Sequence, residues 1–155
     1  MSRNETIYPI GLRLAGRKVV VVGGGVVGTR RVRGLIEVGA RVVVISPVVS
    51  DELANLADAG EIEWFDREYA SGDLEGAWLV HTATGVAEVD AQVAAEAEAN
   101  RILCVNAAVA EDSTAWVPAV VRHDVRSRLH RPGVNQGESR SGTERSLWSP
   151  PVRVV

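Results

Sequence analysis

Lys18-Val-Val-Val-Val-Gly-Gly-Gly-Val-Val-Gly28 decides the fold of this 155-residue chain. Its four consecutive valines predict a strand buried on both faces, because β-branched side chains fit a pleated sheet and no polar residue interrupts the run. Gly23, Gly25 and Gly28 follow in the spacing G-x-G-x-x-G. Apolar residues at helical spacing then predict a helix over residues 29–38. The glycines therefore lie between a buried strand and a helix.

This position gives each glycine a specific expected role. Gly23 allows a tight turn, Gly25 lets a pyrophosphate approach the backbone, and Gly28 lets the helix pack close to the strand. The start of the helix also offers free N–H groups and a partial positive charge to phosphates. A glycine-rich turn with a purely structural role is the alternative. We expect dinucleotide binding by the residues of this turn, namely Gly23, Gly24, Gly25, Val26 and Val27.

Strands and helices alternate in the rest of the first 121 residues. The pattern predicts strands over residues 40–46, 61–65, 78–84 and 101–106, and helices over residues 50–59 and 86–100. Strands that are separated by helices pair in parallel through right-handed crossovers. We therefore expect an α/β fold, a Rossmann-like doubly wound parallel sheet.

The composition changes sharply after residue 121. Residues 122–155 include only 8 apolar residues among 34, without a helical or strand period, and are rich in Arg, Ser, Gly and Pro. Such a segment buries too little surface to offset the entropy of ordering it. We predict a nucleotide-binding domain over residues 1–121, followed by a disordered or truncated basic tail over residues 122–155. The abrupt change suggests a shift of reading frame.

Charge and cysteine content argue against several classes of function. Residues 1–121 carry 10 Lys/Arg against 17 Asp/Glu, and this acidic body argues against nucleic-acid binding. No apolar run approaches the roughly 20 residues that span a bilayer, so no membrane association is expected. Cys104, the single cysteine, fits a reducing cytoplasm and is expected to be a buried hydrophobe rather than a nucleophile. No cluster of Cys and His residues suggests a metal site.

The carboxyl ends of the strands are where an open parallel sheet binds its ligand. Ser46 ends the second strand, where NAD enzymes usually carry an acid for the ribose hydroxyls, and serine can also bond a hydroxyl. Pro47 and Val48 follow, and no adjacent arginine favours a 2′-phosphate, so NAD is favoured over NADP. Thr84 lies in a small-residue loop that lines the cleft or only packs. His81 is a ligand contact or a buried sheet residue.

Further segments are informative together. They are Tyr8-Pro-Ile-Gly-Leu-Arg-Leu-Ala-Gly16 with the glycine turn, Gly72-Asp-Leu-Glu-Gly-Ala-Trp-Leu-Val-His-Thr-Ala-Thr84, Ala95-Glu-Ala-Glu-Ala-Asn-Arg-Ile-Leu-Cys-Val-Asn106, and Ala115-Trp-Val-Pro118. Over residues 8–121 the chain resembles the siroheme synthase N-terminal domain family. These are the precorrin-2 dehydrogenases, which are often also sirohydrochlorin ferrochelatases.

The resemblance implies an enzyme of siroheme biosynthesis. Its members are oxidoreductases that transfer a hydride from precorrin-2, a tetrapyrrole, to NAD and so form sirohydrochlorin. Many members then insert ferrous iron, and the region after residue 118 makes a homodimer in the family. The resemblance also implies that the cofactor contacts the Gly23–Val27 turn and Pro47–Val48.

Two features depart from the family pattern. The family has an aspartate four positions after the cysteine, important for dehydrogenation and chelation, and this position is Ala108 here. Asp112, just past the last predicted strand, is the candidate catalytic group that could replace it. The tail is the second departure, because it takes the place of the dimerisation region. A non-catalytic NAD-binding module, or a degenerate remnant of the enzyme, is therefore the alternative function, and a Rossmann reductase of small substrates is a third.

Overall fold

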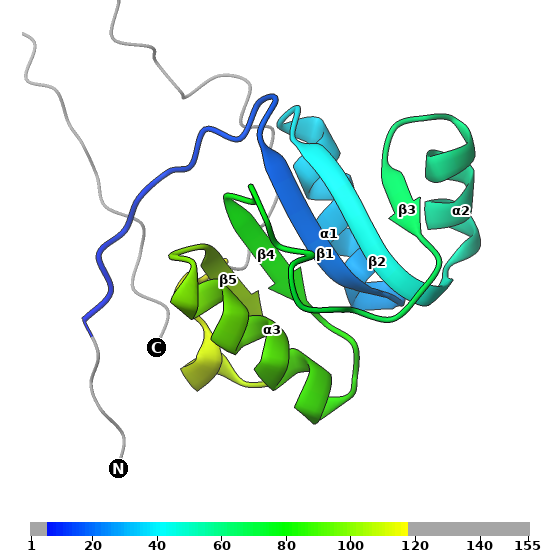
Figure 1. Ribbon diagram of the computed structural model, residues 1–155. Coiled ribbons are helices and arrows are strands. Elements are labelled where there is room, and N and C mark those ends of the chain that lie inside the picture. The colour runs from blue at the N-terminus through cyan, green and yellow to red at the C-terminus, as the bar shows by residue number, and fades with distance from the viewer. Residues whose placement is uncertain (1–5, 118–155) are drawn as a thin grey trace, which may run out of the picture. The chain divides into compact units, whose positions relative to one another are not determined.

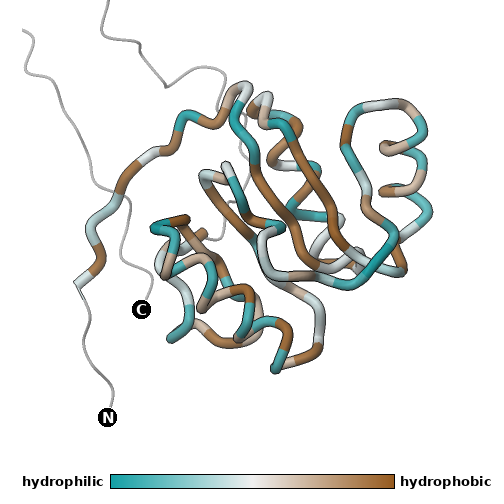
Figure 2. The backbone as a smooth tube through the Cα atoms, in the orientation of Figure 1, coloured by the Kyte–Doolittle hydropathy of each residue, from teal (hydrophilic) through white to brown (hydrophobic). Residues whose placement is uncertain are grey.

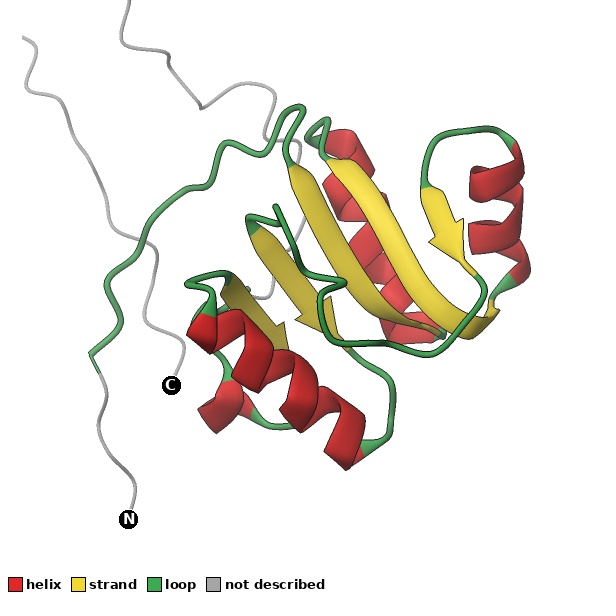
Figure 3. Cartoon of the chain, viewed as in Figure 1, coloured by secondary structure: helices red, strands yellow, loops and turns green. Residues whose placement is uncertain are grey.

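The computed structural model describes residues 6–117. In chain order its elements are β1 (Lys18–Gly24), α1 (Val26–Glu37), β2 (Arg41–Val49), α2 (Asp51–Asp58), β3 (Glu63–Phe65), β4 (Leu79–Thr82), α3 (Ala87–Ala99), β5 (Leu103–Asn106) and the short 3-10 helix η1 (Ala110–Asp112). The five strands form a parallel sheet in the order β3-β2-β1-β4-β5 (Figures 1 and 3). The order reverses at β1, which is the Rossmann topology.

The valine run of β1 forms the centre of the sheet. β1 pairs with β2 on one side and with β4 on the other, and Val19, Val20 and Val21 have no exposed surface. Figure 2 shows the hydrophobic residues of β1 and β2 in two neighbouring strands. Burying a valine side chain contributes roughly 1.5–3 kcal/mol, so this pair of strands anchors the domain.

Helices cover both faces of the sheet, which confirms the doubly wound fold. Val32 and Leu35 of α1 and Leu53 of α2 pack in one buried cluster with the valines that face them. Val93 and Ala97 of α3 pack in a second cluster against the opposite face. Figure 1 shows α1 and α3 on opposite sides of the strands.

The connection from β3 to β4 crosses the sheet without a helix. Leu74 in this connection is fully buried and packs in the same cluster as α3. The carboxylate of Asp73 accepts a hydrogen bond from the backbone N–H of Ala70 at 2.8 Å and forms an ion pair with Arg67. Asp73 therefore stabilises a turn, which is the structural role that a loop aspartate is expected to have.

Strand β2 is longer than the predicted strand over residues 40–46. Beyond an irregularity after Val22, Gly24 of β1 pairs with Val49, so the strand continues through Pro47. Ser50 then caps α2 as its sequence suggests, because its Oγ accepts from the backbone N–H of Leu53 at 3.3 Å. The tertiary contact with the glycine turn, which no local pattern encodes, extends the strand.

Some expectations concern the ends of the chain. Residues 8–16 precede β1 outside the sheet, and Tyr8 is exposed whereas Leu14 is buried in the core. The predicted tail over residues 122–155 lies outside the described residues, as does the end of the predicted domain after residue 117. No helix between residues 6 and 117 is both long and apolar enough to cross a membrane.

Candidate functional site

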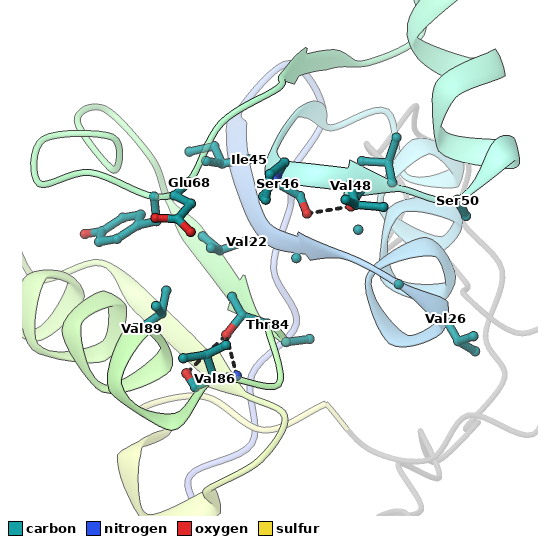
Figure 4. Close-up of a pocket in the computed structure, with 17 residues that line it drawn as sticks. Val22, Val26, Ile45, Ser46, Val48, Ser50, Glu68, Thr84, Val86 and Val89 are labelled. Atoms are coloured by element: carbon teal, nitrogen blue, oxygen red, sulfur yellow. Dashed lines mark hydrogen bonds between the residues drawn. The ribbon is translucent and has the colours of Figure 1, made fainter.

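A cavity of about 590 Å³ lies at the carboxyl ends of β1, β2 and β4 (Figure 4). Its volume is in the range of small-molecule sites. The structure brings most of the predicted cofactor residues together here, and Val27 alone among them is not part of the lining. The predicted residues that line this main cavity are Gly23, Gly24, Gly25, Val26, Ser46, Pro47, Val48 and Thr84.

The three glycines of the motif have different surroundings. Gly23 has φ +110°, and a Cβ there would lie 2.4 Å from the carbonyl oxygen of Ala83. Both the backbone conformation and the lack of space therefore require glycine at this position. A Cβ on Gly28 would lie 2.3 Å from the carbonyl oxygen of Gly23. The absence of a side chain at Gly28 therefore allows α1 to pack close to β1. A Cβ on Gly25 would meet no atom within 4 Å. Gly25 therefore leaves open space at the cavity wall, where a ligand can approach the backbone.

No side chain of residues 6–117 hydrogen-bonds to the free backbone N–H groups at the start of α1. Gly25 is its N-cap residue, no side chain caps the helix, and its first turn holds no acid. The Oγ1 of Thr29 donates to the Gly25 carbonyl oxygen at 2.8 Å and also contacts the Oγ of Ser50. The free N–H groups of the first turn thus stay available for an anion at the cavity.

Ser46 is held in one orientation at the end of β2. Its Oγ donates to the carbonyl oxygen of Val48 at 2.7 Å, and its own carbonyl oxygen accepts from the Trp64 indole at 2.9 Å. The lone pairs of this Oγ remain to accept a hydrogen bond from a ligand hydroxyl. Glu68 is the one charged residue among the described lining residues, so no arginine or lysine of residues 6–117 lines the cavity.

The far wall of the cavity depends on Asp90, which is not among the site residues expected from the sequence. Asp90 is 1% exposed, and its Oδ1 accepts from the Thr84 backbone N–H at 3.1 Å, the Thr84 Oγ1 at 2.8 Å and the Thr82 Oγ1 at 2.5 Å. Its Oδ2 has no partner among the described residues. Asp90 therefore positions the Thr84 loop. The sequence feature that could have pointed to Asp90 is its place as an acid in the first turn of the helix that follows this loop.

Other candidate residues lie outside this cavity. Asp112 is exposed on η1, and Ala108 is exposed in the turn after β5. His81 is 4% exposed within β4, where burial and then the charge of Arg31 lower its pKa to about 4. His81 is thus a neutral, buried sheet residue. No group of three or more His, Cys, Asp or Glu side chains within residues 6–117 could hold a metal ion.

Cys104 is expected to react with Ellman's reagent at least about 100-fold more slowly in the native chain than in the chain unfolded in urea. Its side chain has no exposed surface. Burial, followed by the charges of Asp112 and Asp90, raises the pKa of the thiol to about 11, so the thiolate is scarce at neutral pH. The absorbance of the released thiolate measures both rates, and equal rates would contradict the buried, unreactive role.

Comparison with known proteins shows which family this domain resembles. The NAD_binding_7 family model, which describes NAD(P)-binding domains, matches residues 10–119. Siroheme synthase of Chromobacterium violaceum is 41% identical over 114 residues, which cover 74% of this chain and 24% of that protein. Siroheme synthase 1 of Aeromonas salmonicida is 46% identical over 85 residues, 55% of this chain and 18% of that protein.

The chain belongs to the siroheme synthase N-terminal family. A solved structure titled "SirC, precorrin-2 dehydrogenase" superposes with a TM-score of 0.62 at 29% identity, covering 73% of this chain and 55% of that one. This confirms the resemblance to the precorrin-2 dehydrogenases and supports a nicotinamide cofactor. The chain spans about a quarter or less of the curated siroheme synthases that it matches.

Proposed function

We propose that this chain is the NAD-binding domain of a precorrin-2 dehydrogenase that acts in siroheme biosynthesis in the cytoplasm. The main cavity is the observation that carries the proposal. It combines an open glycine, Gly25, with the uncapped start of α1 at the ligand edge of a Rossmann sheet. The proposed domain covers residues 1–121, with the segment 122–155 in place of the family's dimerisation region. Homodimer formation, and ferrous iron as a second substrate, are parts of the proposal that rest on the family resemblance.

We propose NAD rather than NADP as the cofactor. A 2′-phosphate needs cationic partners, and the described lining of the main cavity provides none. Glu68 adds a negative charge that repels such a phosphate. Ser46 can accept a hydrogen bond from a ribose hydroxyl, although a serine holds this hydroxyl less strongly than the acid that it replaces.

The residues of this chain would bind and orient the reactants. NAD, when bound, supplies the acceptor for the hydride that leaves precorrin-2. The glycine turn and the first turn of α1 would hold the pyrophosphate, and Thr84 would fix the wall beside it. A proton must also leave the substrate as the hydride does. The described lining of the main cavity contains no histidine to accept it, and the alanine at position 108 cannot accept a proton.

Replacing Ala108 with aspartate is expected to raise the turnover of precorrin-2 by about 100-fold or more, the size of a general acid–base contribution. Ala108 is exposed, so an aspartate fits without a clash. Anaerobic kinetics with NAD measure the gain, and Ala108→Asn, which cannot take a proton, is the matched control. An equal rate in the wild-type, Ala108→Asp and Ala108→Asn chains would contradict a catalytic role for this position.

An anaerobic assay of the purified chain with enzymatically generated precorrin-2 and NAD tests the proposed function. The absorbance of NADH and of sirohydrochlorin reports turnover. Turnover in the wild-type chain would support the dehydrogenase and make Asp112→Ala the next variant. NAD binding without turnover, in both the wild-type and the Ala108→Asp chains, would favour the second candidate, a non-catalytic NAD-binding module. The alanine at position 108 is the observation behind this candidate.

A further inference from the structure

A second, smaller cavity lies beside the carboxyl end of β5. It has a volume of about 190 Å³, and Arg31 of α1, Asn106 of β5, Ser113 and Trp116 are among its lining residues. This β5 cavity shares no lining residue with the main cavity. It lies at the same ligand edge of the sheet, because Asn106 pairs in register with Thr82 at the end of β4. Cofactor binding in the main cavity leaves the β5 cavity without a role.

Asn106 presents an unused hydrogen-bond donor. The side chain is 5% exposed, and its Oδ1 accepts from the backbone N–H groups of Ala108 at 2.9 Å and Val109 at 3.1 Å. These two bonds fix the orientation of the amide, because only an oxygen can accept them. Nδ2 has no partner among the described residues. A buried donor without a partner is costly, and it marks a place that a ligand can complete.

Arg31 contributes an uncompensated positive charge to the same cavity. The exposed arginines Arg33 and Arg67 pair with Glu52 and Asp73, whereas Arg31 is half-buried and has no ion pair within residues 6–117. Burial, and then the charge of Arg30, lower its pKa from the ordinary value. No Asp or Glu side chain of residues 6–117 forms an ion pair with this guanidinium, and His81, which is neutral, offers no negative charge. An anionic ligand would supply one.

We propose that the β5 cavity binds one carboxylate arm of the tetrapyrrole substrate, with the Arg31 guanidinium and the Asn106 amide Nδ2 as the two donors. A carboxylate fits these donors, because a guanidinium and a planar amide both donate to its oxygens. The cavity is a third of the main cavity in volume, so it suits a side arm rather than a macrocycle. The choice of tetrapyrrole rests on the proposed function.

The location suits a substrate that reacts with a cofactor in the main cavity. Arg31 lies five residues after Val26 on α1, a distance of about 7.5 Å along the helix axis. Val26 lines the main cavity and Arg31 lines the β5 cavity, so α1 links the two sites. A carboxylate held at Arg31 would therefore anchor one edge of the substrate close to the cofactor and beside position 108.

Uroporphyrin III, a stable tetrapyrrole that carries eight carboxylates, is the probe for this site. Its fluorescence is titrated with the full chain, in the presence of NAD, for the wild type and three variants. Arg31→Gln removes the charge. Asn106→Asp keeps the oxygen that accepts from Ala108 and Val109 but replaces the free donor with an acceptor. Arg30→Gln is the matched control, because it removes the same charge from an exposed neighbour that does not line the cavity.

We expect uroporphyrin to bind about tenfold or more weakly to Arg31→Gln and Asn106→Asp, and nearly as tightly to Arg30→Gln as to the wild type. NAD affinity, measured in parallel by calorimetry, is expected to be the same in all four chains. Equal uroporphyrin binding by Arg31→Gln and the wild type, or an equal loss in Arg30→Gln, would overturn the inference.

Two further outcomes separate the proposals. A wild-type chain that binds NAD but not uroporphyrin overturns the β5 site and leaves the cofactor site intact. A wild-type chain that binds uroporphyrin but not NAD overturns the proposed function. A carboxylate from residues 118–155 is another possible occupant. In that case, Arg31→Gln would lower the free energy of unfolding more than Arg30→Gln does, without uroporphyrin binding, and the substrate assignment would fall.

Discussion

Replacing Gly28 with alanine is expected to lower the free energy of unfolding by about 3 kcal/mol. Helix propensity alone predicts the opposite, a gain of about 1 kcal/mol, because alanine is the better helix former. The new Cβ would lie 2.3 Å from the Gly23 carbonyl oxygen, which belongs to the backbone of β1 and cannot rotate away. Helix α1 must therefore move off the sheet, and its first turn leaves the main cavity.

Urea unfolding followed by circular dichroism measures this loss, and Gly25→Ala is the matched control. Gly25 has φ −83°, and a Cβ there would meet no atom within 4 Å, so alanine should change the stability by at most about 1 kcal/mol. Its methyl group would fill the space where a phosphate approaches, so NAD affinity should still fall about tenfold or more. A Gly28→Ala chain as stable as the wild type would show that α1 does not depend on this close contact.

Replacing Asp90 with alanine is expected to cost about 3 kcal/mol of stability and to weaken NAD binding as well. The carboxylate accepts three hydrogen bonds from Thr82 and Thr84 in a buried position. Its removal leaves the Thr82 hydroxyl and the Thr84 backbone N–H without this acceptor, whereas the Thr84 hydroxyl keeps the carbonyl oxygen of Val86 at 3.2 Å. Asp90→Asn keeps an oxygen that can accept, so it should lose less than half as much stability. The Thr84 loop lines the main cavity, and its loosening accounts for the effect on NAD.

Glu88→Ala is the control for Asp90→Ala. Glu88 is an exposed acid in the same first turn of α3, so its removal costs only its favourable interaction with the helix dipole, about 0.3–1 kcal/mol. Urea unfolding and NAD calorimetry on the three variants give both quantities. Asp90→Ala and Glu88→Ala chains with equal stabilities would mean that Asp90 acts only through the helix dipole.

The sequence predicted the parts of this domain that depend on local patterns. The valine run predicted a strand buried on both faces, and the spacing of Gly23, Gly25 and Gly28 matched a close contact at the first and third glycines and open space at the second. These features follow from backbone sterics over a few residues. A structural turn would share the two close contacts, and the open space at Gly25 is what favours a ligand.

The parts that could not be predicted depend on contacts between distant segments. Gly24 also needs to be a glycine, because a Cβ there would lie 2.5 Å from the carbonyl oxygen of Val48 once β2 has continued past Pro47. Asp90 reaches the Thr84 loop only because α3 packs on β4 and β5. Arg31 and Asn106 meet at one cavity only after the chain has folded.

Calorimetric titration of NAD and NADP into the purified chain tests most directly whether the glycine turn of this family member binds NAD. We predict one NAD per chain, weaker binding of NADP, and loss of NAD affinity in a Gly25→Ala chain that unfolds at nearly the wild-type urea concentration. A folded wild-type chain that binds no NAD, or a Gly25→Ala chain that binds it as tightly as the wild type, would contradict NAD binding at this turn.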